Sequence, residues 1–235
     1  MDLHQKQNKL VAFSQVMIYH NDYYEQVDEL FKKLDLNNLL VPFTDNSDID
    51  EISRRNNSTM HISEMKYMIL TDEGFFKKYK NFWIPFEVTE FDLYNDFIQQ
   101  GATYILGLFE MLKKFLLMIL DTKKLEINER STLGQIFYAI SKTPNFEKKK
   151  LETLLMLEVR NMIAHDNWYF EEKNFCYKEN GIVKKLNLDE FVQLIVDVTD
   201  VTNAVYFQWR QYMPKLEFER REKMRNQKSF SLDKL

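Results

Sequence analysis

The chain has 235 residues, of which 45% are hydrophobic and 29% charged, and its net charge at pH 7 is −4. This composition predicts a globular protein with a real core and excludes a disordered chain. The single cysteine excludes an internal disulfide, and the first nine residues lack the apolar core of a signal peptide, so a cytoplasmic location is expected.

Charge is distributed unevenly along the chain. Residues 21–52 carry nine acids and two bases, whereas residues 111–150 carry nine bases and four acids. Residues 215–228 add six bases and three acids. Each cluster fits a solvated helix face, but the basic stretches also fit a surface that neutralises nucleic-acid phosphates.

Residues 1–90 are predicted to form an accessory region that is mainly helical. Apolar residues recur at helical spacing over residues 10–24 and again over 27–34. The polar run over 44–58, which follows Pro42, predicts a loop.

Two short segments of this region are rich in aromatic and β-branched residues. They cover residues 67–70 and 82–88, with a turn-like Asp-Glu-Gly sequence at 72–74 between them. They fit either two short strands or parts of a helix, so the accessory region is expected to contain short strands at most.

From residue 91 the apolar pattern becomes strongly helical. Residues 91–121 predict one long helix, whose most apolar part is interrupted by Glu110, Lys113 and Lys114. These charges predict a buried amphipathic helix and exclude a membrane span.

Two more helices are predicted before residue 170. A short helix covers 131–141, with Ser131 or Thr132 as its N-cap. A third helix covers 147–166 and carries the most informative motif of the chain.

The remaining chain is predicted to contain one excursion, one long helix and a tail. Residues 171–186, with an Asn-Gly pair at 180–181, indicate a small hairpin or an irregular excursion. The last long helix covers 188–213 and ends before Pro214. The charged tail, 214–235, is expected to fray or to form an extra helix.

The motif is the sequence Arg-Asn-Met-Ile-Ala-His over residues 160–165. An arginine and a histidine are separated by four residues, of which the first is polar. A run of leucines precedes the motif: Leu151, Leu154, Leu155 and Leu157.

This arrangement resembles the R-x4-H signature of the HEPN superfamily (higher eukaryotes and prokaryotes nucleotide-binding). The order of the predicted helices, long, short, motif-bearing and long, is similar to the HEPN bundle. The resemblance implies an all-α four-helix bundle over residues 91–213, roughly half of the chain. It also implies a metal-independent endoribonuclease of prokaryotic stress response or antiviral defence, acting as an abortive-infection or toxin-like effector.

The resemblance implies that Arg160 and His165 are catalytic, with Asn161, Glu110 and Glu158 in support. When RNA is cleaved through its 2′-OH, a base must take the hydroxyl proton and an acid must protonate the departing 5′-oxygen. Histidine can serve as either near neutral pH, and a guanidinium group suits phosphate oxygens. Asn161 is expected to orient the histidine or to bond phosphate.

Helix geometry limits how Arg160 and His165 can act on the same substrate. On an ideal helix Arg160 and His165 lie about 140° apart, at about 100° per residue. The arginine must then reach around, or the helix must end near His165, or two copies of the motif must line one cleft. HEPN ribonucleases use the third solution, so a homodimer is expected. The apolar residues of this helix spread over much of its circumference, which favours burial by neighbours or by a partner chain.

A structural reading of the same residues is also open. Arg160 fits a surface arginine paired with Glu158 or Asp166, and His165 fits a helix C-terminus, where a cation is favourable. Within the HEPN group, some members bind a nucleotide, a nucleic acid or a protein partner and do not cleave.

RNA is expected to make weaker contacts near the motif. Lys148, Lys149 and Lys150 offer charge, and Trp168 and Tyr169 offer rings on which bases can stack. The aromatic pair also fits a hydrophobic core at a helix end.

No metal and no cofactor are expected. His4, His20 and His61 lack partners at metal-ligand spacing, and Cys176 lacks the setting of a nucleophile. The expected partners are RNA, a second copy of the chain and an antitoxin or defence-system protein, without membrane contact. HEPN toxins often carry a tyrosine two residues after the histidine, and here that residue is Asn167, so regulation by modification of that tyrosine is not expected.

Overall fold

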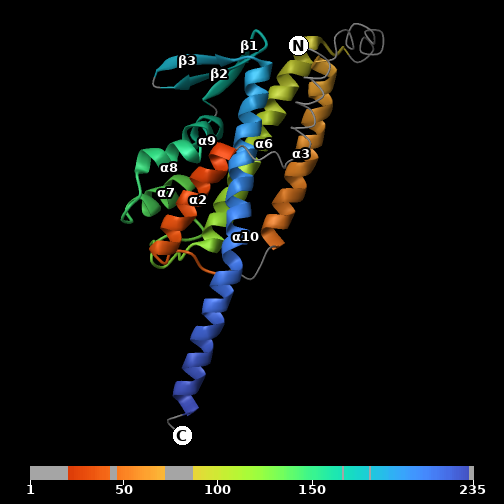
Figure 1. Ribbon diagram of the computed structural model, residues 1–235. Coiled ribbons are helices and arrows are strands. Elements are labelled where there is room, and N and C mark those ends of the chain that lie inside the picture. Colours follow the sequence, from red (N-terminus) through yellow and green to blue (C-terminus); the bar gives the residue numbers. More distant parts are fainter. Residues whose placement is uncertain (1–20, 43–46, 72–86, 166, 180, 233–235) are drawn as a thin grey trace.

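The computed structural model describes residues 21–42, 47–71, 87–165, 167–179 and 181–232. Over these residues the protein is mostly helical, as predicted, and a small antiparallel sheet packs at one end of the helices (Figure 1). The strands lie in the segment after the motif, where a hairpin or an irregular excursion was predicted.

The central helix, α6 (Glu90–Ile119), confirms the long helix predicted over 91–121. It begins with a capping box, in which the Thr89 hydroxyl accepts from the Asp92 N–H and the Asp92 carboxylate accepts from the Thr89 N–H. Its buried residues spread around most of the circumference, so other helices pack on several sides of it.

The longest helix, α10 (Leu188–Leu232), runs beside α6 in the same direction (Figure 1). Phe97 packs edge-on against Phe191 near the start of both helices, with ring centres 6.0 Å apart. Farther along, Phe115 packs against Trp209 at 5.3 Å. The packing of α6 against α10 through these contacts forms the centre of the hydrophobic core.

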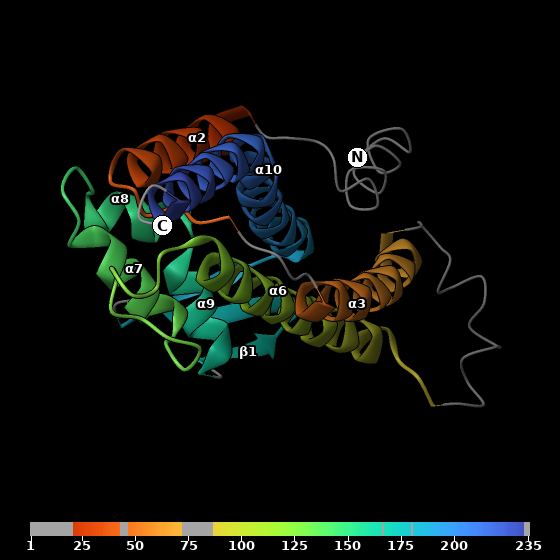
Figure 2. The same cartoon turned by 90° about the horizontal axis from the view of Figure 1, so that it is seen from below.

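Helix α2 (Asn21–Leu36) lies along α10 (Figure 2). Val27, Phe31 and Leu34 are fully buried, which confirms the helical spacing predicted over 27–34. The apolar pattern over residues 10–20 lies outside the described residues.

Helix α3 (Ser47–Thr71) packs against α6 and corrects two predictions. Residues from Ser47 onward are helical, not a loop. Arg54, Arg55 and Asn57 are exposed, whereas Asn56, Met60 and Tyr67 are buried against α6. Residues 67–70 belong to this helix, so the strand alternative is wrong there. Residues 82–86 lie outside the described residues.

Helix α10 continues through Pro214, where the sequence predicted its end. A proline inside a helix removes one hydrogen bond and clashes with the preceding turn, at a cost of about 3 kcal/mol. The residues after it offset that cost, since Leu216 is buried in the core and Lys215 forms an ion pair with Asp35 of α2. The charged segment beyond projects away from the body of the protein (Figure 1).

The short helix α7 (Leu133–Ser141) confirms the prediction over 131–141. Thr132 is its N-cap, and the capping box joins it reciprocally to Gln135. Leu133, Ile136, Phe137 and Ile140 are buried.

The predicted single helix over 147–166 is wrong, because it is broken into α8 (Lys148–Leu154) and α9 (Leu157–Ala164). Met156 has φ 48° and ψ 42°, a left-handed conformation that costs a non-glycine residue about 1–2 kcal/mol. Leu151 and Leu154 before the break and Leu157 after it are all buried, and the apolar area that they remove from water offsets the cost of the strained residue.

The sheet consists of β1 (Trp168–Glu171), β2 (Asn174–Glu179) and β3 (Ile182–Leu186), in that order and antiparallel. The hairpin prediction over 171–186 is therefore confirmed for β2 and β3, and β1 adds a strand that begins before it. Phe175 anchors the sheet, since its ring lies 4.8 Å from that of Phe191 in α10. The sheet thus covers the end of the bundle next to α9.

Candidate functional site

Helix α9 presents the motif on its solvent-facing side. Leu157, Met162 and Ile163 are buried, and α9 packs on α6 through this apolar side. The exposed residues on the other side are Glu158, Asn161, Ala164 and His165. The motif helix is therefore amphipathic, and within the described part of this chain its neighbours cover only one side of it.

His165 lies at the C-terminal end of α9, about 140° around the helix axis from Arg160 at about 100° per residue. His165 is the C-cap of α9, with φ −105° and ψ 15°, and its N–H donates to the carbonyl of Asn161. Within a single chain Arg160 turns its side chain around the helix toward the face that carries Asn161 and His165, which is the first of the geometric solutions considered above.

Asn161 stands between the two functional side chains. Arg160 Nη1 donates a hydrogen bond of 3.0 Å to Asn161 Oδ1, so the guanidinium is turned toward the side that carries His165. Arg160 itself is partly buried. Asn161 therefore orients the arginine, a role different from the predicted contact with histidine or phosphate.

Within the described part of the chain, neither Arg160 nor His165 forms an ion pair. No salt bridge joins Arg160 to Glu158, and the exposed imidazole of His165 has no hydrogen-bond partner among the described residues. Asp166, the other partner considered for the arginine, lies outside these residues. Both groups are thus open to a ligand or to a second chain.

The sheet brings two residues to the motif that the sequence did not single out. The Lys178 N–H donates to the carbonyl of Asn167 at 3.5 Å, which extends the β1–β2 ladder to within two residues of His165. Tyr177 lies opposite Trp168, and its pKa is raised by burial and by the charge of Glu158. The alternating sequence pattern of β2 indicates a strand. Only the pairing register of β1 with β2 shows that Tyr177 and Lys178 lie near α9.

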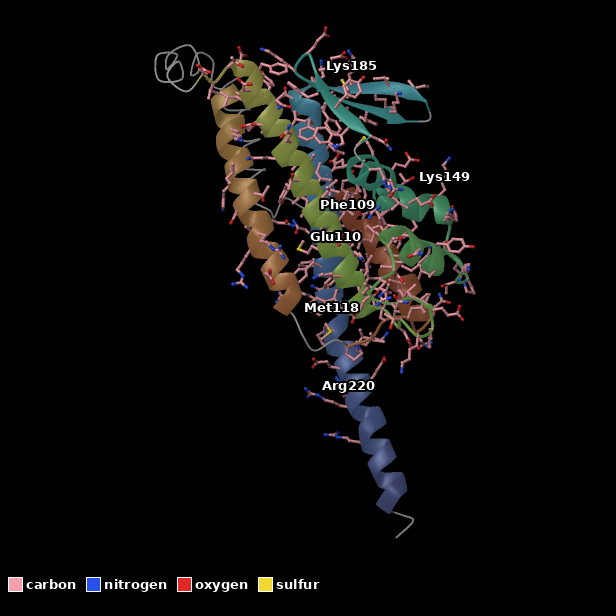
Figure 3. All side chains as sticks on the ribbon, turned by 180° about the vertical axis from the view of Figure 1, so that it is seen from behind. Phe109, Glu110, Met118, Lys149, Lys185 and Arg220 are labelled. Carbon is pink, nitrogen blue, oxygen red and sulfur yellow. The ribbon has the colours of Figure 1, made fainter. Side chains whose placement is uncertain are left out.

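Glu110 does not join the site. It is exposed on α6 (Figure 3), and no hydrogen bond or ion pair within the described residues links it to Arg160 or His165. The expected support from this glutamate is therefore absent. Glu158 is on α9 itself and acts on Tyr177 through its charge.

The three lysines expected to contact RNA lie at the start of α8. Lys148 pairs with Glu152 and Lys150 with Glu147, both at 3.4 Å, across exposed surface where such pairs contribute little stability. Lys149 is exposed, as Figure 3 shows, and it borders a hollow of about 580 Å³ between α8 and α2.

The two aromatic candidates occupy opposite faces of β1. Trp168 is partly buried, with its ring 5.3 Å from that of Phe175, so it belongs to the core, as the alternative interpretation had it. Tyr169 points to the other face and is 42% exposed, which leaves its ring accessible to a base.

The described residues contain no group of three or more His, Cys, Asp or Glu side chains that could hold a metal ion. Cys176 is buried, and burial raises the pKa of its thiol, which disfavours the reactive thiolate. Among the helices that the structure describes, none has the length and apolarity needed to cross a bilayer.

Comparison of the chain with known protein families, with curated proteins and with solved structures found no match. The motif and its geometry are therefore the features of this chain that point to a function.

Proposed function

We propose that this protein is a metal-independent endoribonuclease of the HEPN type, in which Arg160 and His165 of two chains act together in a homodimer. The single observation that carries the proposal is the hydrogen bond from Arg160 Nη1 to Asn161 Oδ1, which turns the guanidinium toward the face of α9 on which His165 is exposed. The helix order α6, α7, α8–α9 and α10 supports it, since the HEPN bundle has a similar order.

The chemistry needs a base, an acid and a positive charge. One His165 takes the proton of the 2′-OH, whose oxygen attacks the adjacent phosphorus as the bond from phosphorus to the 5′-oxygen breaks. The His165 of the second chain donates a proton to that departing 5′-oxygen, and the two Arg160 guanidinium groups stabilise the negative charge on the phosphate. The products are a 2′,3′-cyclic phosphate and a 5′-hydroxyl.

The exposed motif face explains why a second chain is required. One chain offers one imidazole, whereas the reaction uses a base and an acid at the same time. Ala164, the small residue exposed between Arg160 and His165, lets two α9 helices approach closely around a two-fold axis. The proposed setting is prokaryotic defence or stress response, as an effector held in check by a partner protein.

The decisive experiment measures RNA cleavage by purified Arg160→Ala and His165→Ala variants. Each should lose about 10²-fold or more of the cleavage rate, the range expected for removal of an acid–base group. Matched controls are Arg210→Ala on α10 and His61→Ala on α3, both exposed positions outside α9. All four variants should keep the wild-type circular dichroism spectrum.

The result also separates this function from its rival. RNA cleavage that persists in both the Arg160→Ala and the His165→Ala variants would contradict the proposed role of the motif. A wild-type protein that binds RNA or nucleotide without cutting it would favour the alternative, a non-catalytic HEPN module.

A further inference from the structure

A polar groove lies beside α7, formed by the end of that helix and by the loop that precedes it. Its volume is about 610 Å³, and its walls include the side chains of Lys124, Arg130, Gln135, Tyr138 and Lys142. The residues that line it include three bases and a single acid, Glu126.

Two of the three cations in this groove are not neutralised within the described part of the chain. The Arg130 side chain and the Lys142 ammonium make no ion pair there, although the Arg130 backbone N–H donates to Asn128. Lys124 is held in place, because its ammonium donates to the carbonyl of Asn38 at 2.9 Å. The groove therefore offers fixed positive charge to an anion.

An exposed aromatic ring stands among these cations. Tyr138 is 52% exposed, and the Lys142 ammonium lies 4.3 Å from the centre of its ring. The ammonium of Lys148, at the start of α8, lies 5.9 Å from the same centre. A ring flanked by cations is the combination that binds single-stranded nucleic acid, since bases stack on the ring and phosphates meet the charges.

We propose that this groove binds a single-stranded segment of RNA, with one base stacked on Tyr138 and neighbouring phosphates held by Arg130 and Lys142. The strand is single because bases inside a duplex are stacked on one another and cannot reach a side chain on the surface. RNA is named as the ligand because this inference rests on the proposed ribonuclease function. In that case the groove binds a part of the RNA substrate at a site separate from the motif.

The test uses the full-length His165→Ala protein, which keeps the substrate intact, and a fluorescent single-stranded RNA. Tyr138→Ala should weaken binding by roughly ten-fold, the loss expected from one stacked base. Tyr138→Phe keeps the ring and should bind as the parent does. Arg130→Ala and Lys142→Ala should each lower the slope of log affinity against log salt by about 0.7.

The matched control is Lys32→Ala on α2, an exposed lysine that forms an ion pair with Asp28 and lies outside the groove. It should leave both affinity and salt slope unchanged. Equal binding by Tyr138→Ala and its parent overturns the proposal, as does duplex RNA that competes as well as the single strand.

The RNA-binding groove and the ribonuclease activity can be tested independently of each other. Cleavage by the wild type together with Tyr138-independent binding would leave the ribonuclease standing and remove the groove. Tyr138-dependent binding by a protein that never cuts RNA would keep the groove and remove the ribonuclease.

Discussion

The backbone N–H of Lys178 donates to the carbonyl of Asn167, and this bond places a lysine of β2 next to the end of the motif helix. Thirteen residues separate Lys178 from His165 along the chain, yet the hairpin folds the lysine back to the motif. Lys178 is exposed and forms no ion pair among the described residues, so its charge is available to an anion that approaches this end of α9.

The first prediction follows from this bond. Lys178→Ala should weaken binding of RNA and raise KM several-fold while kcat changes less, because the lysine attracts phosphate without transferring a proton. Lys185→Ala on β3 is the matched control, since that lysine is already paired with Glu171 at 2.8 Å. Steady-state cleavage kinetics measure both, and equal KM values for the two variants would contradict the role of Lys178.

The second prediction concerns assembly. Ala164→Glu should convert the proposed dimer to a monomer and remove cleavage, because a charged side chain on the proposed contact surface of α9 would repel its symmetry mate. Gln211→Glu, at an exposed position of α10, is the control for added charge. Light scattering at micromolar concentration reports the mass. A wild-type protein that is monomeric under these conditions would remove the basis for pairing two motifs.

The third prediction concerns the reaction. Cleavage should proceed in EDTA and leave a 2′,3′-cyclic phosphate, and a substrate with 2′-deoxyribose at the cut site should be inert. The rate should show a bell-shaped pH dependence, because one histidine must be neutral while its mate is protonated. End-group analysis and rates across pH measure this. Magnesium-dependent cutting of the deoxy substrate would show that another mechanism operates.

The fourth prediction concerns the packing of α3 on α6. A Cβ placed on Gly107 would lie 2.0 Å from Asn56 Oδ1, so Gly107→Ala should lower the free energy of unfolding by about 1–3 kcal/mol. Adding Asn56→Ala should restore part of that loss, since the amide nitrogen of Asn56 is buried without a partner. Gly134→Ala in α7, where the nearest atom is 3.9 Å away, should be tolerated. Urea denaturation gives all three values.

The fifth prediction concerns alkaline stability. Burial, together with the charge of Asp189 and a hydrogen bond to it, raises the pKa of Tyr67 to about 12. The unfolded chain releases this proton near pH 10. The contribution of Tyr67 is therefore complete below about pH 10 and is lost as the pH rises toward 12. The free energy of unfolding should fall less steeply over that range in Tyr67→Phe than in the wild type, whereas Tyr169→Phe should match the wild type.

Much of the helical architecture follows from local patterns. The apolar spacing over 91–121, the N-cap at Thr132 and the hairpin signal at 180–181 each predicted an element that the structure contains. These features are readable because capping, turns and amphipathic spacing act over a few residues. The motif itself is equally local, so Arg160 and His165 could be selected from the chain alone.

The elements that were predicted wrongly depend on contacts between distant residues. Pro214 interrupts a helix pattern, but the pairing of Lys215 with Asp35 and the burial of Leu216 keep α10 continuous. The sequence at the start of α3 is polar and therefore predicts a loop. The segment is helical because α3 packs against α6. Such contacts are set by the packed core and leave no periodic signal in the sequence.

The sequence by itself determined that the protein is mostly helical and which residues are candidates for chemistry. Only the tertiary structure decided that the motif helix is broken at Met156, that it ends at His165 and that Lys178 lies beside it. Met156 divides the apolar segment into two helices, and the leucines on both sides of the break, Leu151 and Leu157, are buried. Strand register, which depends on hydrogen bonds between segments, then brings β2 to the motif.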